Sequence, residues 1–180
     1  MKRWLGIVAL VTVALCGGCN GCKKATGPVT TTAAGTPPAP FLPTQAQPKL
    51  RTMKLWLGTA EIDAEVALTL QEQATGMMFR TNRLAENTGM LFPLPYTQRA
   101  SFWMLNCPLP LSAAYIDPDG VIQEIIVLKA NDTNGVVAAS SNIRFVLEEP
   151  EGWFQRHNIS TGAVVRTSSG SLMDTFFPRR

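Results

Sequence analysis

Five residues could together form a small binding site. Arg80, Asn106, Asp117 and Glu148 each stand beside apolar strand or turn residues, and Trp103 lies near Asn106 in the sequence. Charged groups in apolar settings are usually paired, so one interpretation is a structural ion pair between Arg80 and Glu148. The other is a cleft beside Trp103 for a small polar or sugar-like ligand, because such clefts combine aromatic surface with a few directed polar groups. In that interpretation we expect Asn106 to face the opening.

Hydrolytic chemistry would need a nucleophile next to a base. Ser112, Thr161 and Cys107 are suitable nucleophile types, but His157 is the only histidine in the chain. No spacing brings His157 beside any of the three, and we expect it on the surface at the end of a short helix. We therefore assign no catalytic residue and keep an envelope-localised hydrolase as the rival hypothesis.

Soft metal ligands are also present. Met77, Met78, Met90, Met104 and Cys107 carry the sulfur atoms that suit Cu(I). They lack the tight repeated spacing of a copper motif, and methionine commonly fills gaps in protein cores. We expect these residues to be core residues, with Cys107 as a small buried hydrophobe, and we expect no metal and no cofactor.

Short strands must position these side chains. Residues 52–57 and 61–68 alternate between apolar and polar types on either side of Gly58, which predicts a hairpin of two half-buried strands. The acidic residues of the second segment fall on one face, which we interpret as a solvated face.

A capping box follows the hairpin. In Thr69-Leu70-Gln71-Glu72 the threonine and glutamate can each bond the other's backbone N–H, which predicts a helix that begins there and runs to about Ala74. Gly76 can adopt the left-handed conformation that ends such a helix.

The remaining pattern is mostly β. Apolar runs predict strands over residues 90–93, 102–104, 111–116, 121–128, 144–148 and 163–167. The turn at 117–120 predicts a hairpin, the nearly continuous apolar run 121–128 predicts a central strand, and residues 149–157 suit a second short helix. About seven strands and two helices with antiparallel neighbours predict a single α+β domain with a mostly antiparallel, curved or barrel-like sheet.

The first residues predict export. Met1-Lys2-Arg3 precede a short apolar run over residues 4–15, which is typical of a secretory signal and too short to span a bilayer. Cys19 follows Gly17-Gly18, as at the cut site of bacterial lipoproteins, although Cys16 stands where such sites usually have leucine. We expect residues 1–19 to be the signal and Cys19 to carry the lipid, with plain secretion as the alternative.

Composition divides the rest of the chain. Residues 20–49 are rich in Pro, Thr and Ala and predict a disordered linker, residues 50–170 the folded domain, and residues 171–180 a frayed tail. The domain holds nine basic and twelve acidic residues, so the overall charge of +3 comes from the two ends of the chain. We therefore expect a membrane partner through the lipid anchor and no nucleic acid.

With these segments in view, the chain resembles the family called domain of unknown function 192 (DUF192). The matching motifs are Gly76-Met77-Met78-Phe79-Arg80, Gly89-Met90-Leu91-Phe92, Phe102-Trp103-Met104 with Asn106 and Pro110-Leu111, and Val146-Leu147-Glu148 with Gly152. The resemblance implies a small, mostly β domain, often exported or lipid-anchored, with no established activity.

The chain departs from the family pattern at polar positions. Leu105, Cys107, Ser112 and Ala163 stand where the family favours Lys, Thr, Asp and Asp. If the residues that the family favours at these positions form a site, that site is weakened in this chain, which lacks them. The hypothesis from sequence is therefore a lipid-anchored, extracytoplasmic binding or accessory domain of the cell envelope.

Overall fold

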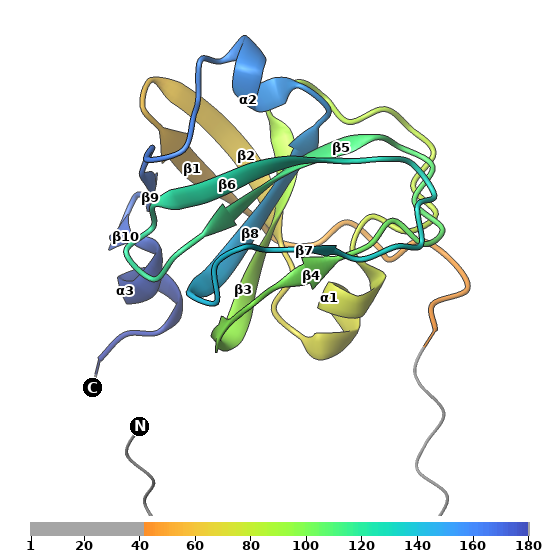
Figure 1. Ribbon diagram of the computed structural model, residues 1–180, viewed down its shortest axis with the longest axis horizontal. Coiled ribbons are helices and arrows are strands. Elements are labelled where there is room, and N and C mark those ends of the chain that lie inside the picture. The colour runs from red at the N-terminus through yellow and green to blue at the C-terminus, as the bar shows by residue number, and fades with distance from the viewer. Residues whose placement is uncertain (1–41, 180) are drawn as a thin grey trace, which may run out of the picture. The chain divides into compact units, whose positions relative to one another are not determined.

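One eight-stranded mixed sheet forms the framework of the domain in the computed structural model, which describes residues 42–179. Its strands run in the order β10-β9-β1-β2-β3-β8-β5-β6 (Figure 1), and β2 and β3 are its one parallel pair within the described range. The strands are β1 (Thr52–Leu57), β2 (Ala60–Val66), β3 (Thr88–Gln98), β5 (Leu111–Ile116), β6 (Ile122–Leu128), β8 (Ile143–Pro150), β9 (Val165–Thr167) and β10 (Gly170–Ser171). A small second sheet pairs β4 (Ser101–Phe102) with β7 (Val136–Val137).

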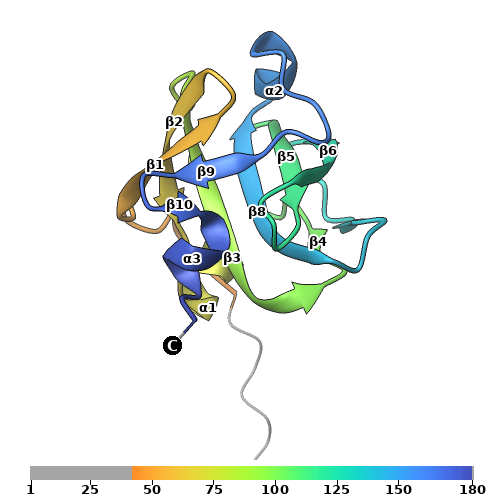
Figure 2. The ribbon, with the colours of Figure 1, turned by 90° about the vertical axis from the view of Figure 1, so that its left-hand side faces the viewer.

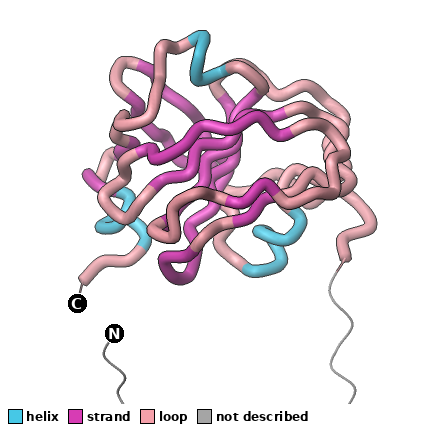
Figure 3. Tube along the Cα trace, viewed as in Figure 1, coloured by secondary structure: helices cyan, strands magenta, loops and turns pink. Residues whose placement is uncertain are grey.

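The described helices are all short: α1 (Leu70–Thr75), α2 (Trp153–Arg156) and α3 (Leu172–Phe176) (Figure 3). None of the helices in residues 42–179 has the length and apolar character needed to cross a membrane. The predicted signal over residues 1–19, Cys19 and the linker as far as residue 41 lie outside the described residues.

The sheet is strongly curved. Val121, directly before β6, forms an isolated antiparallel bridge with Val164, directly before β9, and backbone hydrogen bonds between residues 120–122 and 162–165 join the two sides of the sheet there. Figure 2 shows β9 running between β1 on one side and β6 on the other. The expected α+β domain with a mostly antiparallel curved sheet is confirmed, and the sheet is not closed into a barrel.

The hairpin and helix predicted at the start of the domain are both confirmed. β1 and β2 pair antiparallel with Leu55 opposite Ile62. Thr69 Oγ1 accepts a hydrogen bond from Glu72 N at 3.1 Å, and Glu72 Oε2 accepts one from Thr69 N at 2.8 Å. Because the parallel strands β2 and β3 need a crossover, α1 and the loop after it carry the chain from one to the other.

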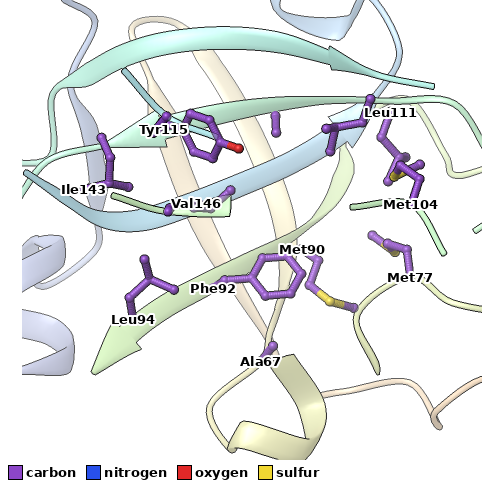
Figure 4. Close-up of a cluster of buried hydrophobic side chains, with 14 of the residues drawn as sticks. Ala67, Met77, Met90, Phe92, Leu94, Met104, Leu111, Tyr115, Ile143 and Val146 are labelled. Carbon is purple, nitrogen blue, oxygen red and sulfur yellow. The ribbon is translucent and has the colours of Figure 1, made fainter. Parts of the chain in front are cut away.

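Two hydrophobic clusters fill the faces of the curved sheet. On β3, Met90 and Phe92 point into the first cluster (Figure 4) and Leu91 into the second. On β8, Val146 points into the first cluster and Leu147 into the second. Successive side chains of a strand point to opposite faces, so strands covered on both faces contribute to both clusters.

Two strands differ from their prediction. The strand predicted over 90–93 continues as β3 through Pro93 and Pro95, and its register with β8 shifts between Pro93 and Gln98. Such irregularities accommodate prolines, which donate no ladder hydrogen bond. The prediction that 121–128 is central is wrong: β6 pairs only with β5 and stands at the edge, while β8 lies between β3 and β5.

The frayed tail predicted after residue 170 is also wrong. Ser171 caps α3 by accepting a hydrogen bond from Asp174 N at 3.0 Å, and Leu172 is fully buried in the second cluster. Part of the predicted linker is ordered as well, because Pro43 is buried and Gln47 Nε2 donates to Gly76 O at 2.9 Å. The folded domain therefore extends beyond 50–170 at both ends.

Candidate functional site

Arg80 is held by a carboxylate that the sequence pattern placed in solvent. Its Nη1 and Nη2 donate to Glu65 Oε1 and Oε2 at 2.5 and 2.8 Å. Leu50 N also donates to Glu65 Oε2, at 2.7 Å. Burial raises the pKa of Glu65, but the bonds from Arg80 and Leu50 outweigh it and lower the pKa below its ordinary value. The predicted ion pair between Arg80 and Glu148 is therefore wrong.

The Arg80–Glu65 pair forms part of the wall of an open cleft of about 650 Å³, which we call the polar cleft. It lies beside the parallel pair β2 and β3 and is bounded by the loop that follows α1. Its other lining residues are Ala46, Lys49, Thr52, Asp63, Phe79, Thr81, Asn82, Arg83, Leu84, Ala85, Thr88 and Gly89.

A second, much smaller space is lined in part by residues of the first hydrophobic cluster. This methionine cavity, of about 40 Å³, is lined by Gln73, Thr75, Gly76, Met77, Met78, Phe92, Phe102, Trp103, Met104, Leu105, Cys107 and Glu148. Trp103 is 46% exposed, whereas Glu148 is only 4% exposed. Two of the five predicted site residues, Trp103 and Glu148, thus share one cavity, and Arg80 lines the polar cleft instead.

Glu148 is a buried acid. Its burial raises its pKa to about 8, against the smaller opposing effect of the Arg80 charge. The carboxyl makes no hydrogen bond or ion pair with any residue of the described chain. Its neighbour Glu149 is fully buried, both of its carboxyl oxygens lack a partner, and burial raises its pKa well above the ordinary value.

The other two predicted site residues line neither space. Asn106 is exposed at φ 56°, and its carbonyl accepts a hydrogen bond from Phe79 N at 2.7 Å. Asp117 organises the turn between β5 and β6, where its Oδ1 accepts from Asp119 N and Val121 N, each at 2.9 Å. Asp117 is thus a structural turn residue, and Asn106 joins two loops through its backbone.

The described residues offer no nucleophile beside a base. Ser112 is fully buried and accepts a hydrogen bond from Gly152 N at 3.0 Å. Burial raises the pKa of Cys107 to about 11, which keeps the thiol protonated at neutral pH. His157, at the end of α2, stacks on Trp153 with ring centroids 4.3 Å apart and lies 3.4 Å from Glu86, away from Ser112 and Cys107. Over residues 42–179, no cluster of three His, Cys, Asp or Glu side chains could hold a metal ion.

Glu65 is the site residue that the sequence pattern missed. Glu61 and Asp63 are exposed and pair with Lys54, as expected of a solvated face. Glu65 continues the same alternation but is only 8% exposed. The one available signal was Arg80, a lone cation after the apolar run 77–79 that needs a buried partner.

Comparison with known proteins places this fold among proteins of undefined role. No curated protein matches the chain. A crystal structure from Sinorhizobium meliloti, described as a "putative transcription regulator", is 25% identical with a TM-score of 0.63, over 68% of this chain and 98% of the other. A protein of unknown function from Novosphingobium aromaticivorans is 30% identical with a TM-score of 0.62, over 67% of this chain and 90% of the other.

The family comparison covers most of the described domain. The model of DUF192, described as "Uncharacterized ACR", matches residues 53–167, which run from β1 to the end of β9. The match includes every lining residue of the methionine cavity and all those of the polar cleft except Ala46, Lys49 and Thr52. This chain therefore belongs to the DUF192 family.

Proposed function

We propose that this protein is an exported, lipid-anchored domain of the cell envelope that binds a small polar ligand in the polar cleft. The observation that carries the binding role is the size and chemistry of the cleft. Its volume of about 650 Å³ falls within the range of roughly 300–1,000 Å³ typical of small-molecule sites.

The charges along the cleft favour a hydroxylated or anionic ligand. Arg80 is neutralised by Glu65, and Asp63 lies 3.5 Å from Lys54. Lys49 and Arg83 line the same cleft, are exposed, and form no ion pair with other described residues. Their cationic groups can bind a carboxylate, and the neighbouring Thr81 and Asn82 can hydrogen-bond the hydroxyls of a sugar acid.

The proposal that the protein is exported and lipid-anchored is supported by the sequence alone. The charged start, the short apolar run and the small residues before Cys19 are typical of an exported lipoprotein. The folded domain carries more acidic than basic residues, so a small ligand suits it better than nucleic acid.

A thermal-stabilisation screen of the full mature chain with sugars, sugar acids and small carboxylates tests the binding role. A ligand that binds the native state raises the melting temperature, and the shift grows with the logarithm of its concentration once that concentration exceeds Kd. We expect Arg83→Ala to abolish the shift and Lys129→Ala, an exposed cation elsewhere, to retain it. If no ligand shifts the wild type, or if Arg83→Ala responds as the wild type does, the cleft is not the binding site.

The anchor is tested separately. We expect the wild-type protein to sediment with membranes and to carry a lipid mass on Cys19. Cys19→Ala should release it into the soluble fraction. A mature protein without lipid mass that begins at another residue would contradict the anchor and leave the binding role intact.

A further inference from the structure

Five potential metal ligands meet in the methionine cavity. Met77 and Met78 come from the segment after α1, Met104 and Cys107 from the segment before β5, and Glu148 from β8. Each of them is between 2% and 5% exposed. Figure 4 shows Met77 and Met104 at one end of the first cluster. The spacing in the sequence did not reveal this group because three separate segments supply it.

Backbone hydrogen bonds fix the two loops that carry the sulfur ligands. Phe79 N donates to Asn106 O at 2.7 Å, and both residues have left-handed backbone conformations, with φ of 60° and 56°. Cys107 N donates to Met104 O at 3.0 Å. The four sulfur-bearing side chains are therefore presented on a fixed framework.

Glu148 gives a second and independent indication of a ligand. Its side chain is only 4% exposed, lines the cavity, and forms no hydrogen bond or ion pair with another described residue. The nearby cation Arg80 is already occupied by two bonds to Glu65. A cation inside the cavity would supply the missing partner.

We propose that the methionine cavity is a binding site for a monovalent soft cation, Cu(I), with Met77, Met104 and Cys107 as sulfur ligands and Glu148 beside them. Thioether and thiolate sulfur select Cu(I), and a space of about 40 Å³ suits one ion rather than an organic molecule. Trp103 stands at the rim with about half of its surface exposed, where its ring can cover the ion by a cation–π contact.

Binding needs no redox step. The Cys107 S–H bond breaks, its proton passes to solvent, and the thiolate forms a bond to Cu(I), which stays in the same oxidation state. The ion and the thiolate together are neutral, so the cavity gains no net charge as long as Glu148 stays protonated. Because the ion must displace the thiol proton, affinity should increase with pH.

Anaerobic Cu(I) titration against a chromophoric Cu(I) chelator tests the site in the full chain with Cys16, Cys19 and Cys22 replaced by serine. We expect about one ion per chain, release of about one proton per ion, and quenching of tryptophan fluorescence. Ag(I), a redox-inert probe, should compete. Cys107→Ala, Met77→Leu and Met104→Leu should each weaken binding by at least about tenfold, which is about 1.4 kcal/mol.

Two methionines outside the cavity serve as controls for the ligand substitutions. Met53→Leu and Met173→Leu change methionines that pack against the second cluster, and both should bind Cu(I) as the wild type does. Methionine-to-leucine changes nearly conserve volume, so these variants should stay folded even if Cys107→Ala does not. A chain that binds no Cu(I), or that binds equally well after Met77→Leu and Met104→Leu, would overturn the proposal.

Discussion

Replacing Glu148 by glutamine should change how stability depends on pH. The carboxyl has a pKa of about 8 in the folded protein, against an ordinary value of 4.5, because burial disfavours its charged form. Between these two values the folded state binds more protons than the unfolded chain. The stability that the neutral carboxyl confers is therefore lost as the pH rises above about 4.5. This loss levels off above about pH 8.

The size of the effect follows from the same two values. From pH 5 to pH 8 the free energy of unfolding should fall by roughly 3 to 4 kcal/mol on account of Glu148 alone. Glutamine has nearly the same shape and never ionises. Glu148→Gln should therefore match the wild type near pH 5 and exceed its stability by roughly 3 to 4 kcal/mol near pH 8.

Urea denaturation of both proteins at pH 5, 6, 7 and 8 measures this difference. Glu149→Gln is the matched comparison. Glu149 also has a raised pKa, so its replacement should remove a different part of the pH dependence of stability. If wild type and Glu148→Gln show parallel stability curves over this range, Glu148 does not titrate as a buried acid and the account of the cavity fails.

Three other changes test the fold. Thr69→Ala should lower the free energy of unfolding by about 1 kcal/mol in urea, because it removes the cap acceptor of α1. Gly89→Ala should lower it by about 3 kcal/mol or more, since its new methyl group would overlap the Glu149 carboxyl and the Glu148 carbonyl; a wild-type melting curve would contradict that packing. Leu172→Ala should cost about 2–5 kcal/mol, and a chain ending at Gly170 should melt at a clearly lower temperature, whereas an unordered tail would leave both unchanged.

Local signals in the sequence predicted local structure well. The capping box at Thr69 involves atoms only three residues apart, and the β1–β2 hairpin depends on alternation around a short turn. The family motifs also identified the domain, because they fall on β3, β8 and the loops between the strands. The cap and the hairpin are each determined by residues close together in the sequence.

Features that depend on distant partners were not predictable in the same way. Glu65 continues the alternation of solvent-exposed acids in its strand. Its carboxylate is nevertheless buried, because it pairs with Arg80, fifteen residues later in the chain. The run 121–128 is as apolar as a central strand, but Ile125 and Ile126 pack against different clusters from the edge of the sheet. The two sulfur-bearing loops and Glu148 of β8 likewise meet only in the folded domain, so the methionine cavity has no signature in the spacing of the sequence.

The place of β9 in the sheet has a consequence for the order of folding. β9 pairs with β1, so Leu57 lies opposite Val165, about a hundred residues later in the chain. Closing so long a loop has a high entropic cost, and domains rich in such distant contacts fold slowly. While the chain is being synthesised, the outer edge of β1 stays unpaired until residues 165–167 emerge. Until then it offers free N–H and C=O groups to other strands, so the nascent chain is more prone to aggregate than the finished domain.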